Sequence, residues 1–347
     1  MIVKLGDVCT NASSNLMQKE VAAKNGPYPI YGAAGLIGNV DFFHQDKTYI
    51  AVVKDGAGIG RTMLLPAKSS VIGTMQYLIP NEKVIPEYLY YVVQHMHLEK
   101  YFTGATIPHI YFKDYKHERF NLSLIEEQKR IVKILSKAEF IISQRKQEIQ
   151  KLDNLIKARF VEMFGDPLME KNKTTYQFIG DVAESIDPQP SHRTPPIDEN
   201  GIPYVSIKDC DYLTGTVDFI GARKVGINVL NEQKNRYTIH DGDLIIGKIG
   251  TIGNPIFIPA RNDYTLSANV VLIQPDKNKI SPFFLKYSLM SPFAYNQFAE
   301  AKNSTSQAAF GIQKVRMIRI MNPSLKEQYI FEAFAKQIDK SKFSKIA

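Results

Sequence analysis

The chain has 347 residues, of which 44% are hydrophobic and 22% are charged. This balance excludes an intrinsically disordered or fibrous protein, and the length accommodates roughly two domains of about 100–200 residues each. The formal net charge of +8 indicates a polyanionic partner, although generic surface lysine is the competing interpretation.

The basic residues are spread along the chain and form no polybasic tail. Any contact with nucleic acid must therefore come from folded patches that collect lysine and arginine on one face. Cys9 and Cys210 form no CxxC pair and predict a reducing compartment, without a disulfide or a zinc site. The first residues lack the apolar core of a signal peptide, and no apolar run approaches about 18 residues, so we expect a cytoplasmic protein.

The sequence contains one module twice. Segments of the first half return in the same order in the second half, which indicates a tandem duplication. The period is far longer than that of a solenoid repeat. Two related domains predict a partner that itself has two parts. The matched segments are 5–8 with 179–182, 58–60 and 64–66 with 251–253 and 257–259, 86–91 with 282–287, and 123–128 with 323–328.

Residues 1–123 are predicted to form the first module, a compact α/β domain with many short strands. The pattern indicates a buried strand at residues 49–53 and a second strand at residues 61–65, after a glycine turn. Pro86 precedes a short aromatic helix over residues 87–96, because proline suits the first turn of a helix.

Residues 124–164 are predicted to form one long spacer helix. Mostly apolar residues recur at alternating spacings of four and three, which is a coiled-coil pattern, and no glycine or proline interrupts it. The helix would be roughly 60 Å long. Gly165 and Pro167 end it, since glycine commonly caps a helix and proline cannot continue one. The residues of the pattern are Ile131, Leu135, Ala138, Ile142, Arg145, Ile149, Leu152, Ile156, Arg159 and Met163.

Residues 165–323 are predicted to repeat the plan of the first module, with strands around 243–246 and 256–258 and a helix after Pro282. The second module is longer, and the extra length falls where residues 187–196 form a proline-rich loop outside regular structure. The two modules are therefore expected to share a scaffold and to differ in their loops.

Residues 324–347 copy the start of the spacer helix, and Phe331, Ala335 and Ile338 occupy the register of its first apolar residues. A single amphipathic helix is unstable alone in water, so we expect the two helices to pair antiparallel. The second helix is much the shorter, which leaves part of the spacer helix for another protein. The candidate docking residues are Ile131, Leu135, Ile142, Ile149, Leu152, Ile156, Phe331 and Ile338.

Two glycine-rich turns, residues 56–61 and 247–254, invite comparison with nucleotide-binding loops. Neither matches GxxxxGK[ST], and each lies between two predicted strands, so there is no helix N-terminus to hold a phosphate. A tight turn without a further role is an alternative. We favour a turn whose backbone approaches the DNA backbone beside Lys54 in the first module and Lys248 in the second.

Residues 302–307 form a polar cluster before an apolar stretch. Such side chains hydrogen-bond base edges and phosphates, and they also cap helices, so both interpretations stay open. The counterpart, residues 104–109, shares the position but not the chemistry, so the two modules would read different DNA sequences. His95 and His97 are two residues apart on a predicted helix and point away from each other, which disfavours a metal pair.

The expected fold is α+β: two globular α/β domains joined by a long antiparallel coiled-coil helix pair, with a pseudo-twofold internal repeat. No catalytic motif is recognisable on it. The methyltransferase pattern Asn/Asp-Pro-Pro-Tyr/Phe is absent, and we find neither a metal-nuclease carboxylate cluster nor a helicase P-loop. Two other classes stay open: a self-sufficient methyltransferase or endonuclease with built-in recognition, and a scaffold or DNA mimic that kept the fold without reading DNA.

Several motifs have a family likeness when taken together. They are the helix openings 125–128 and 325–328, Phe-Gly-Asp-Pro at 164–167, Ile-Pro-Tyr-Val at 202–205 and Gly-Thr-Ile-Gly at 250–253. With the duplication, they resemble the specificity subunit of Type I restriction–modification systems over essentially the whole chain. The first module departs from the pattern, because Ala-Gly-Ile-Gly at 57–60 replaces Gly-Thr-Ile-Gly.

The resemblance implies that each module is a target recognition domain reading one half of a split site in double-stranded DNA, and that the chain is not an enzyme. It implies that the helices dock two methyltransferase subunits, which bring S-adenosylmethionine, and that a restriction subunit can join. No cofactor is expected on the chain itself. The candidate DNA-binding residues are Lys54, Arg61, Thr106, His109, Lys113, Arg193, Ser206, Lys208, Lys248, Thr251, Asn254, Lys302, Asn303, Ser304, Thr305, Gln307, Gln313 and Lys314.

Overall fold

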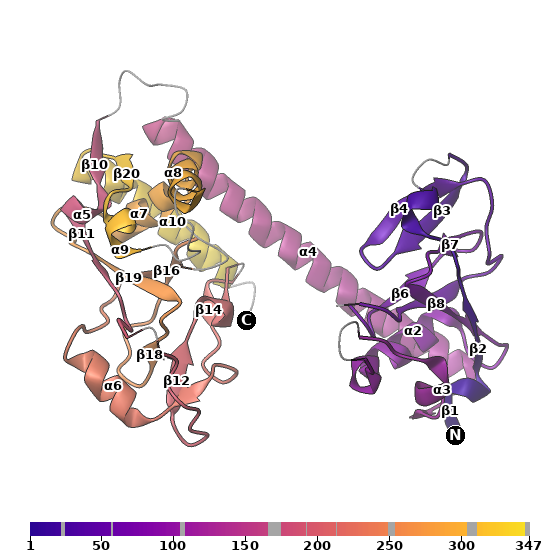
Figure 1. Ribbon diagram of the computed structural model, residues 1–347. Coiled ribbons are helices and arrows are strands. Elements are labelled where there is room, and N and C mark those ends of the chain that lie inside the picture. Colours follow the sequence, from indigo (N-terminus) through magenta and orange to yellow (C-terminus); the bar gives the residue numbers. More distant parts are fainter. Residues whose placement is uncertain are drawn as a thin grey trace. The chain divides into compact units, whose positions relative to one another are not determined.

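The computed structural model describes residues 1–21, 25–56, 58–104, 108–165, 175–191, 193–212, 214–248, 254–303 and 311–343 (Figure 1). The chain divides into two compact units, unit 1 with Met1–Ile142 and unit 2 with Ser143–Ala347. The division falls inside the long helix α4, Ile125–Phe164. The boundaries predicted at 123/124, 164/165 and 323/324 separate modules from helices and stay a prediction.

Unit 1 is built around two main sheets. One has the strand order β2-β8-β5-β6, and the other has the order β4-β3-β7 with β3 and β7 parallel, while β1 pairs with β9. The strands are β1 Ile2–Lys4, β2 Cys9–Ser13, β3 Tyr28–Gly32, β4 Gly35–Val40, β5 Tyr49–Val53, β6 Thr62–Leu65, β7 Ser70–Val71, β8 Met75–Pro80 and β9 Arg119–Asn121. The helices are α1 Gln18–Val21, α2 Pro86–His95, α3 Phe112–Tyr115 and the first turns of α4, with 3-10 turns at Leu5–Asp7 and Leu98–Tyr101.

Unit 2 repeats this topology. Its sheets have the orders β11-β19-β16-β17 and β15-β12-β18, with β12 and β18 parallel, and β10 pairs with β20. The strands are β10 Tyr176–Phe178, β11 Ala183–Ile186, β12 Ile202–Val205, β13 Cys210–Asp211, β14 Thr216–Val217, β15 Lys224–Val225, β16 Leu244–Gly247, β17 Ile256–Phe257, β18 Thr265–Leu266, β19 Val270–Pro275 and β20 Arg319–Met321. The helices are α5 Ile179–Val182, α6 Ile227–Lys234, α7 Pro282–Leu289, α8 Pro292–Asn303, α9 Ile312–Arg316 and α10 Leu325–Phe343, with a 3-10 turn at Ile207–Asp209. The predicted duplication is confirmed.

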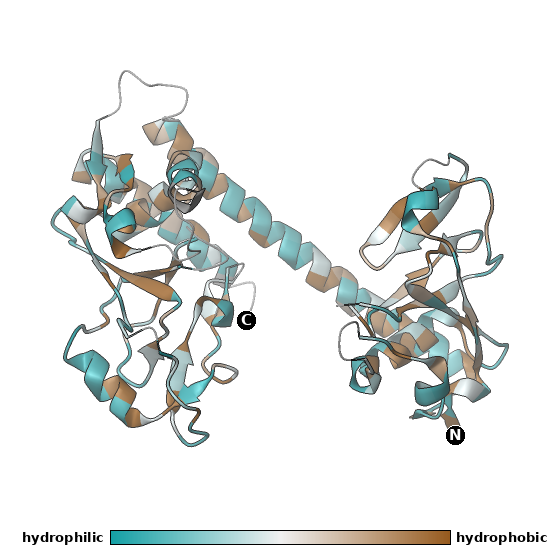
Figure 2. Ribbon diagram, in the orientation of Figure 1, coloured by the Kyte–Doolittle hydropathy of each residue, from teal (hydrophilic) through white to brown (hydrophobic). Residues whose placement is uncertain are grey.

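The core of each unit lies on its four-stranded sheet. The predicted strand 49–53 is β5, and every one of its side chains is buried, as in its equivalent β16. The predicted helix after Pro86 is α2, which packs Leu89 and Val93 against the sheet. Figure 2 shows β19, the neighbour of β16, as a largely hydrophobic strand. Burial of both faces explains why these strands are apolar without alternation.

The first pair of matched segments, residues 5–8 and 179–182, forms a repeated corner, in which a short helical turn directly follows a strand. The carboxylate of Asp7 accepts the backbone N–H of Lys4 at 2.8 Å, and Asp181 caps its corner in the same way at 2.9 Å. Such carboxylates satisfy N–H groups that the start of a helical turn leaves free. A Cβ at Gly180 would lie only 3.3 Å from the carbonyl oxygen of Arg316, which favours glycine there, whereas the equivalent distance at Gly6 is an ordinary contact of 3.4 Å.

The last pair of matched segments, residues 123–128 and 323–328, ends in each unit on a buried glutamine that bonds backbone groups. The side chain of Gln128 bonds three backbone groups, one of which is the N–H of Ile85 just before α2, at 2.9 Å. Gln328 accepts the N–H of Ser281 just before α7, also at 2.9 Å. Both glutamine side chains are buried. Each therefore fixes the start of its long helix to the short helix of the same unit.

In unit 2, helices α4 and α10 pack antiparallel. Phe164 at the end of α4 lies against Phe331 near the start of α10, with ring centroids 5.8 Å apart. Lys342 near the end of α10 reaches back to Asp153, with its ammonium 2.5 Å from the carboxylate. Phe331 and Ile156 are fully buried between the helices and the core. The predicted antiparallel pairing is confirmed.

The candidate docking residues fall into two groups. One group is buried or half-buried within unit 2 by the packing of α4 and α10, so these side chains are not free for another protein: Ile149, Leu152, Ile156, Phe331 and Ile338. In unit 1, Ile131 packs against the core, whereas Leu135 and Ile142 are 36% and 54% exposed. Of the candidate docking residues, those left exposed for a partner therefore lie on the unit 1 part of α4.

Candidate nucleic-acid interface

Three candidate residues meet where β5 ends in unit 1. The ammonium of Lys54 is 3.6 Å from one carboxylate oxygen of Asp55, and Nδ1 of His109 is 2.7 Å from the other. The imidazole of His109 stacks against Tyr111 with centroids 6.4 Å apart, and the ammonium of Lys113 lies 5.3 Å from the centre of the Tyr111 ring. We call these five residues the Lys54 cluster.

The Lys54 cluster combines cations with an exposed aromatic face. Tyr111 is 49% exposed, and Lys113 is exposed on α3. Because an ionised carboxylate can only accept, Nδ1–H of His109 is the donor in its contact with Asp55. Such a group can bind a phosphate through its lysines and can contact bases through its rings.

Sequence reasoning missed Asp55 and Tyr111. The predicted glycine turn begins one residue after Asp55, and neither residue is assigned a role from the sequence. A signal for Tyr111 was present, because residues two apart on an extended segment point to the same side, and Tyr111 is two residues beyond His109. Nothing in the sequence linked Asp55 to His109, since the backbone bridge that joins them forms only in the fold.

The glycine turn that follows is explained by packing. Gly60 has a φ of +81°, and a Cβ there would lie 2.6 Å from the backbone nitrogen of Glu99. The side chain of Arg61 donates to the carbonyl of Ala33 at 3.1 Å. The carboxylate of Glu99 lines the recess of about 350 Å³ beside this turn, which disfavours a phosphate there. The tight-turn alternative therefore accounts for this segment, and a DNA contact by Arg61 stays a prediction.

Lys248, the equivalent of Lys54 in unit 2, requires a correction. Its side chain is buried, and its ammonium is 2.6 Å from the carboxylate of Asp187, an ion pair without hydrogen-bond geometry. A buried ammonium with an internal partner is not presented to a DNA phosphate. Lys248 instead fixes the proline-rich loop to the end of β16, a role that the sequence pattern did not indicate.

The other described candidates of unit 2 lie on separate elements. The backbone N–H of Ser206 donates to the carboxylate of Asp209 at 2.8 Å, and Ser206 is buried just before the 3-10 turn Ile207–Asp209, so a DNA contact by its hydroxyl stays a prediction. Gln313 lies on α9, the equivalent of α3, which carries Lys113 in unit 1. Lys314 is half-buried. The exposed candidates are Arg193, Lys208, Asn254 and Gln313.

Several predicted contacts cannot be placed. Lys302 and Asn303 end helix α8, of which only the backbone is described there. The remaining candidates lie outside the described residues: Thr106, Thr251, Ser304, Thr305 and Gln307. Their contacts with DNA stay predictions.

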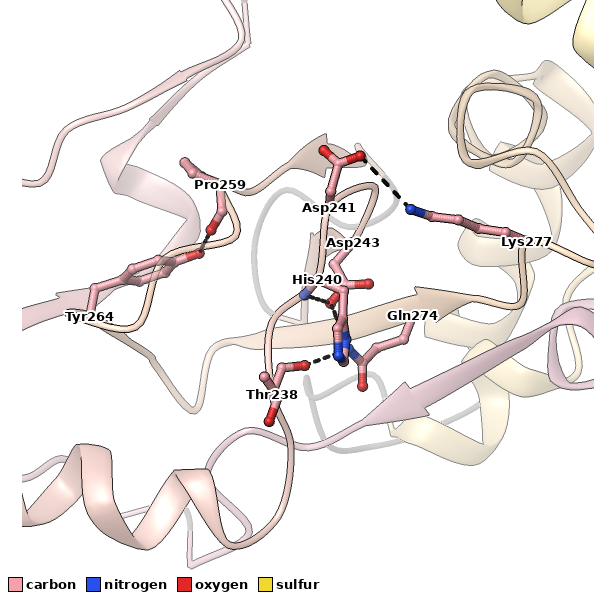
Figure 3. A network of polar contacts seen from close by, with 8 residues as sticks. All are labelled: Thr238, His240, Asp241, Asp243, Pro259, Tyr264, Gln274 and Lys277. Atoms are coloured by element: carbon pink, nitrogen blue, oxygen red, sulfur yellow. Dashed lines mark hydrogen bonds and ion pairs between the residues drawn. The ribbon is translucent and has the colours of Figure 1, made fainter.

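Figure 3 shows a polar network before β16 that pairs a histidine with an aspartate. The buried carboxylate of Asp243 accepts the backbone N–H of His240 at 2.8 Å and the side-chain amide of Gln274 at 2.5 Å. That amide also donates to the carbonyl of Thr238 at 2.8 Å. Burial raises the pKa of Asp243. These groups are paired with one another, so the network holds the loop that precedes β16 against strand β19.

Within the described ranges, no group of three His, Cys, Asp or Glu side chains is placed to hold a metal ion. Burial raises the pKa of Cys9 to about 12 and that of Cys210 to about 11, so both thiols stay protonated near neutral pH. A search of the same ranges finds no helix with the length and apolarity needed to cross a membrane.

The comparisons with known proteins agree with this architecture. The family described as "Type I restriction modification DNA specificity domain" matches residues 1–153 and 172–345. The chain is 24% identical over 317 residues to the Type I restriction enzyme MjaVIII specificity subunit of Methanocaldococcus jannaschii, which covers 84% of this chain and 72% of that protein. Its fold is similar to that of the Type I restriction–modification system S subunit from M. genitalium, with a TM-score of 0.55, 16% identity and coverage of 100% of this chain and 92% of that one.

The two matched ranges together cover most of both units, and the duplicated topology agrees with them. The chain therefore belongs to the Type I restriction modification DNA specificity family and is the non-catalytic DNA specificity subunit of such a system.

Proposed function

We propose that units 1 and 2 each read one half of a bipartite target in double-stranded DNA, with α4 and α10 fixing the gap between the halves. The observation that carries this proposal is a duplicated scaffold with different polar groups at equivalent places. Lys113 on α3 corresponds to Gln313 on α9, and the open Lys54 corresponds to the internal Lys248. A lysine binds phosphate or guanine, whereas a glutamine can pair with adenine, so the two units would prefer different sequences.

In unit 1 the Lys54 cluster would make the central contact. Lys54 and Lys113 would bind phosphates, and Tyr111 with His109 would face the bases. In unit 2 the exposed Arg193, Lys208, Asn254 and Gln313 would act together with the predicted contacts at Thr251 and at residues 302–307.

The exposed part of α4 in unit 1 would dock methyltransferase subunits, of which we expect two, and a restriction subunit would join the complex. S-adenosylmethionine binds the methyltransferase subunit in this family, so the chain itself requires no cofactor. Because both cysteines are free, we expect the complex to act in the cytoplasm.

Methylome sequencing of a host with and without this gene tests the proposal. The expected result is loss of one methylated motif made of two specified parts around an unspecified gap. A heptad deletion within 142–156 should shorten that gap and leave both specified parts unchanged. A contiguous motif, or a change in the specified bases after the deletion, would refute the two-reader arrangement. Binding of S-adenosylmethionine by the isolated chain would favour a self-sufficient methyltransferase.

A further inference from the structure

A groove of about 610 Å³ opens in unit 1 where α2 meets the first turns of α4. Its apolar wall continues along α4 through the exposed Leu135. The side chains that matter here are Tyr88, Tyr91 and His95 of α2, Phe120 of β9, and Ile131 and Leu135 of α4.

The equivalent junction of unit 2 is filled. There, α7 corresponds to α2, and the first turns of α10 correspond to those of α4, held by the matching glutamines. The ring centroid of Phe160 on α4 lies 5.5 Å from that of Phe284 and 5.3 Å from that of Phe331. The ring of Phe164, one turn further along α4, lies 4.9 Å from Phe284. Two phenylalanines one helical turn apart therefore cover this junction.

The internal repeat matches the two junctions residue by residue. Leu135 is more exposed than its fully buried equivalent, which indicates a missing neighbour in unit 1. The equivalent pairs are Tyr88 with Phe284, Tyr91 with Tyr287, Ile131 with Phe331, and Leu135 with Ala335.

The chemistry differs at the far end of the two junctions. In unit 2, Lys342 of α10 pairs with Asp153 of α4 at 2.5 Å. The equivalent of Lys342 in unit 1 is Ile142, which is 54% exposed and follows the exposed Phe140 and Ile141. In unit 2, α4 faces the cation of Lys342, whereas a helix lying in the unit 1 groove would face apolar side chains at the same place. An acidic residue at the position of Asp153 would therefore have no partner in unit 1.

We propose that this groove binds one amphipathic α-helix of another subunit, antiparallel to α4. That helix places two aromatic residues, four positions apart, in the groove and an aliphatic residue two turns before the first of them. A second copy of the chain fits less well, because its own Phe160 and Phe164 are engaged in its unit 2 and its Asp153 would face Ile142. The inference rests on the proposed function only in assigning the helix to another subunit of the complex.

A synthetic peptide of residues 149–165 with Asp153→Leu and Phe160→Trp tests the groove against the full chain. The chain contains no tryptophan, so tryptophan emission reports the peptide alone. We expect a blue shift on binding. The peptide that keeps Asp153 should bind at least about tenfold more weakly, and one with Phe164→Ala should also lose affinity.

Leu135→Lys in the chain should reduce peptide affinity at least about tenfold, since it places a charge in the groove. Leu155→Lys is the matched control, because Leu155 is also exposed on α4, at 47%, and lies in unit 2. Equal binding by wild type and Leu135→Lys, or no peptide binding, overturns the inference. A wild-type dimer in sedimentation that Leu135→Lys dissociates also overturns it, in favour of a second copy.

Co-purification with the methyltransferase subunit separates this inference from the proposed function. If the methyltransferase subunit does not associate with the wild-type chain, the proposed function fails. If it associates equally with wild type and Leu135→Lys, only the groove assignment fails. Loss of association with Leu135→Lys and retention with Leu155→Lys is the expected result.

Discussion

Units 1 and 2 share their hydrogen-bonded corners but differ at the place where the central strand of each sheet ends. Lys54 and Lys248 both follow the central strand of their sheets, yet the side chain of Lys54 is 25% exposed and that of Lys248 is 5% exposed. The difference arises because the proline-rich loop of unit 2 brings Asp187 over the strand end. Equivalent positions in a duplicated protein therefore need not have equivalent roles, and a charged residue at a turn is a poor guide to a ligand contact until its internal partners are known.

The two units also differ at the helix junction. In unit 2 a second helix completes the core around Phe331, whereas in unit 1 the equivalent Ile131 lies beside an open groove. The same start of a long helix is thus a core element in one unit and the edge of a surface in the other.

The largest expected effect separates these two junctions. Phe331→Ala should destabilise unit 2 by about 3–5 kcal/mol, because it removes a fully buried aromatic ring and leaves a cavity. Ile131→Ala should cost unit 1 clearly less, because Ile131 is only half-buried. Hydrogen exchange of β16 and β5 amides, followed by mass spectrometry, reports each unit separately. Equal losses would show that the unit 1 junction is already complete.

Lys248→Met should destabilise unit 2 by about 2–4 kcal/mol, since it leaves the Asp187 carboxylate without its partner. Lys54→Met should change the stability of unit 1 by less than about 1 kcal/mol, because the ion pair of Lys54 with Asp55 is only partly buried. DNA binding should show the reverse, with Lys54→Met lowering the salt slope by about one unit and Lys248→Met leaving it unchanged in protein that remains folded. Competition binding at two salt concentrations measures this, and a lower slope for Lys248→Met would restore the phosphate contact inferred from the sequence.

The shared corners should respond alike. Gln128→Ala and Gln328→Ala should each lower the free energy of unfolding by about 1–3 kcal/mol. Each substitution removes the hydrogen-bond partner of a buried backbone N–H and of at least one carbonyl. Urea unfolding followed by unit-specific hydrogen exchange compares them. A difference of more than about 1.5 kcal/mol between the two losses would mean that the repeated glutamine contributes differently to the stability of the two units.

The smallest expected effect concerns pH. Hydrogen bonds from Lys100 and Tyr101 lower the pKa of Glu118 in unit 1, so its stabilisation is complete above the usual glutamate pKa and is lost as the pH falls through the lowered value. Burial raises the pKa of Asp243 in unit 2, so its contribution is most favourable below the usual aspartate pKa and is lost as the pH rises through the raised value. Lowering the pH should therefore destabilise unit 1 through Glu118 and stabilise unit 2 through Asp243.

Glu118→Gln should reduce the acid sensitivity of unit 1 by about 0.5 kcal/mol, the size expected of an ion pair whose lysine is exposed to solvent. Asp243→Asn should flatten the opposite trend in unit 2. Hydrogen exchange between pH 4 and pH 7, corrected for intrinsic rates, measures both. An unchanged pH dependence in Glu118→Gln would show that its hydrogen bonds contribute nothing to stability.

The sequence by itself determined the duplication, the extent of α4, the strand β5 and the helix after Pro86. Each of these depends on local signals: matched segments, an uninterrupted heptad pattern, a short apolar run and a proline at a helix start. The antiparallel pairing of α4 with α10 was also predictable, since each helix has one apolar side that must be covered.

Only the tertiary structure decided which polar residues face solvent. Lys248 and Asp187 are far apart in the sequence, as are Asp55 and His109, and each pair meets only when the sheets assemble. The empty groove beside Leu135 was equally invisible, because a heptad pattern shows that a helix has an apolar side but not whether another helix lies on it. Burial and charge pairing depend on long-range packing, whereas secondary structure follows largely from neighbouring residues.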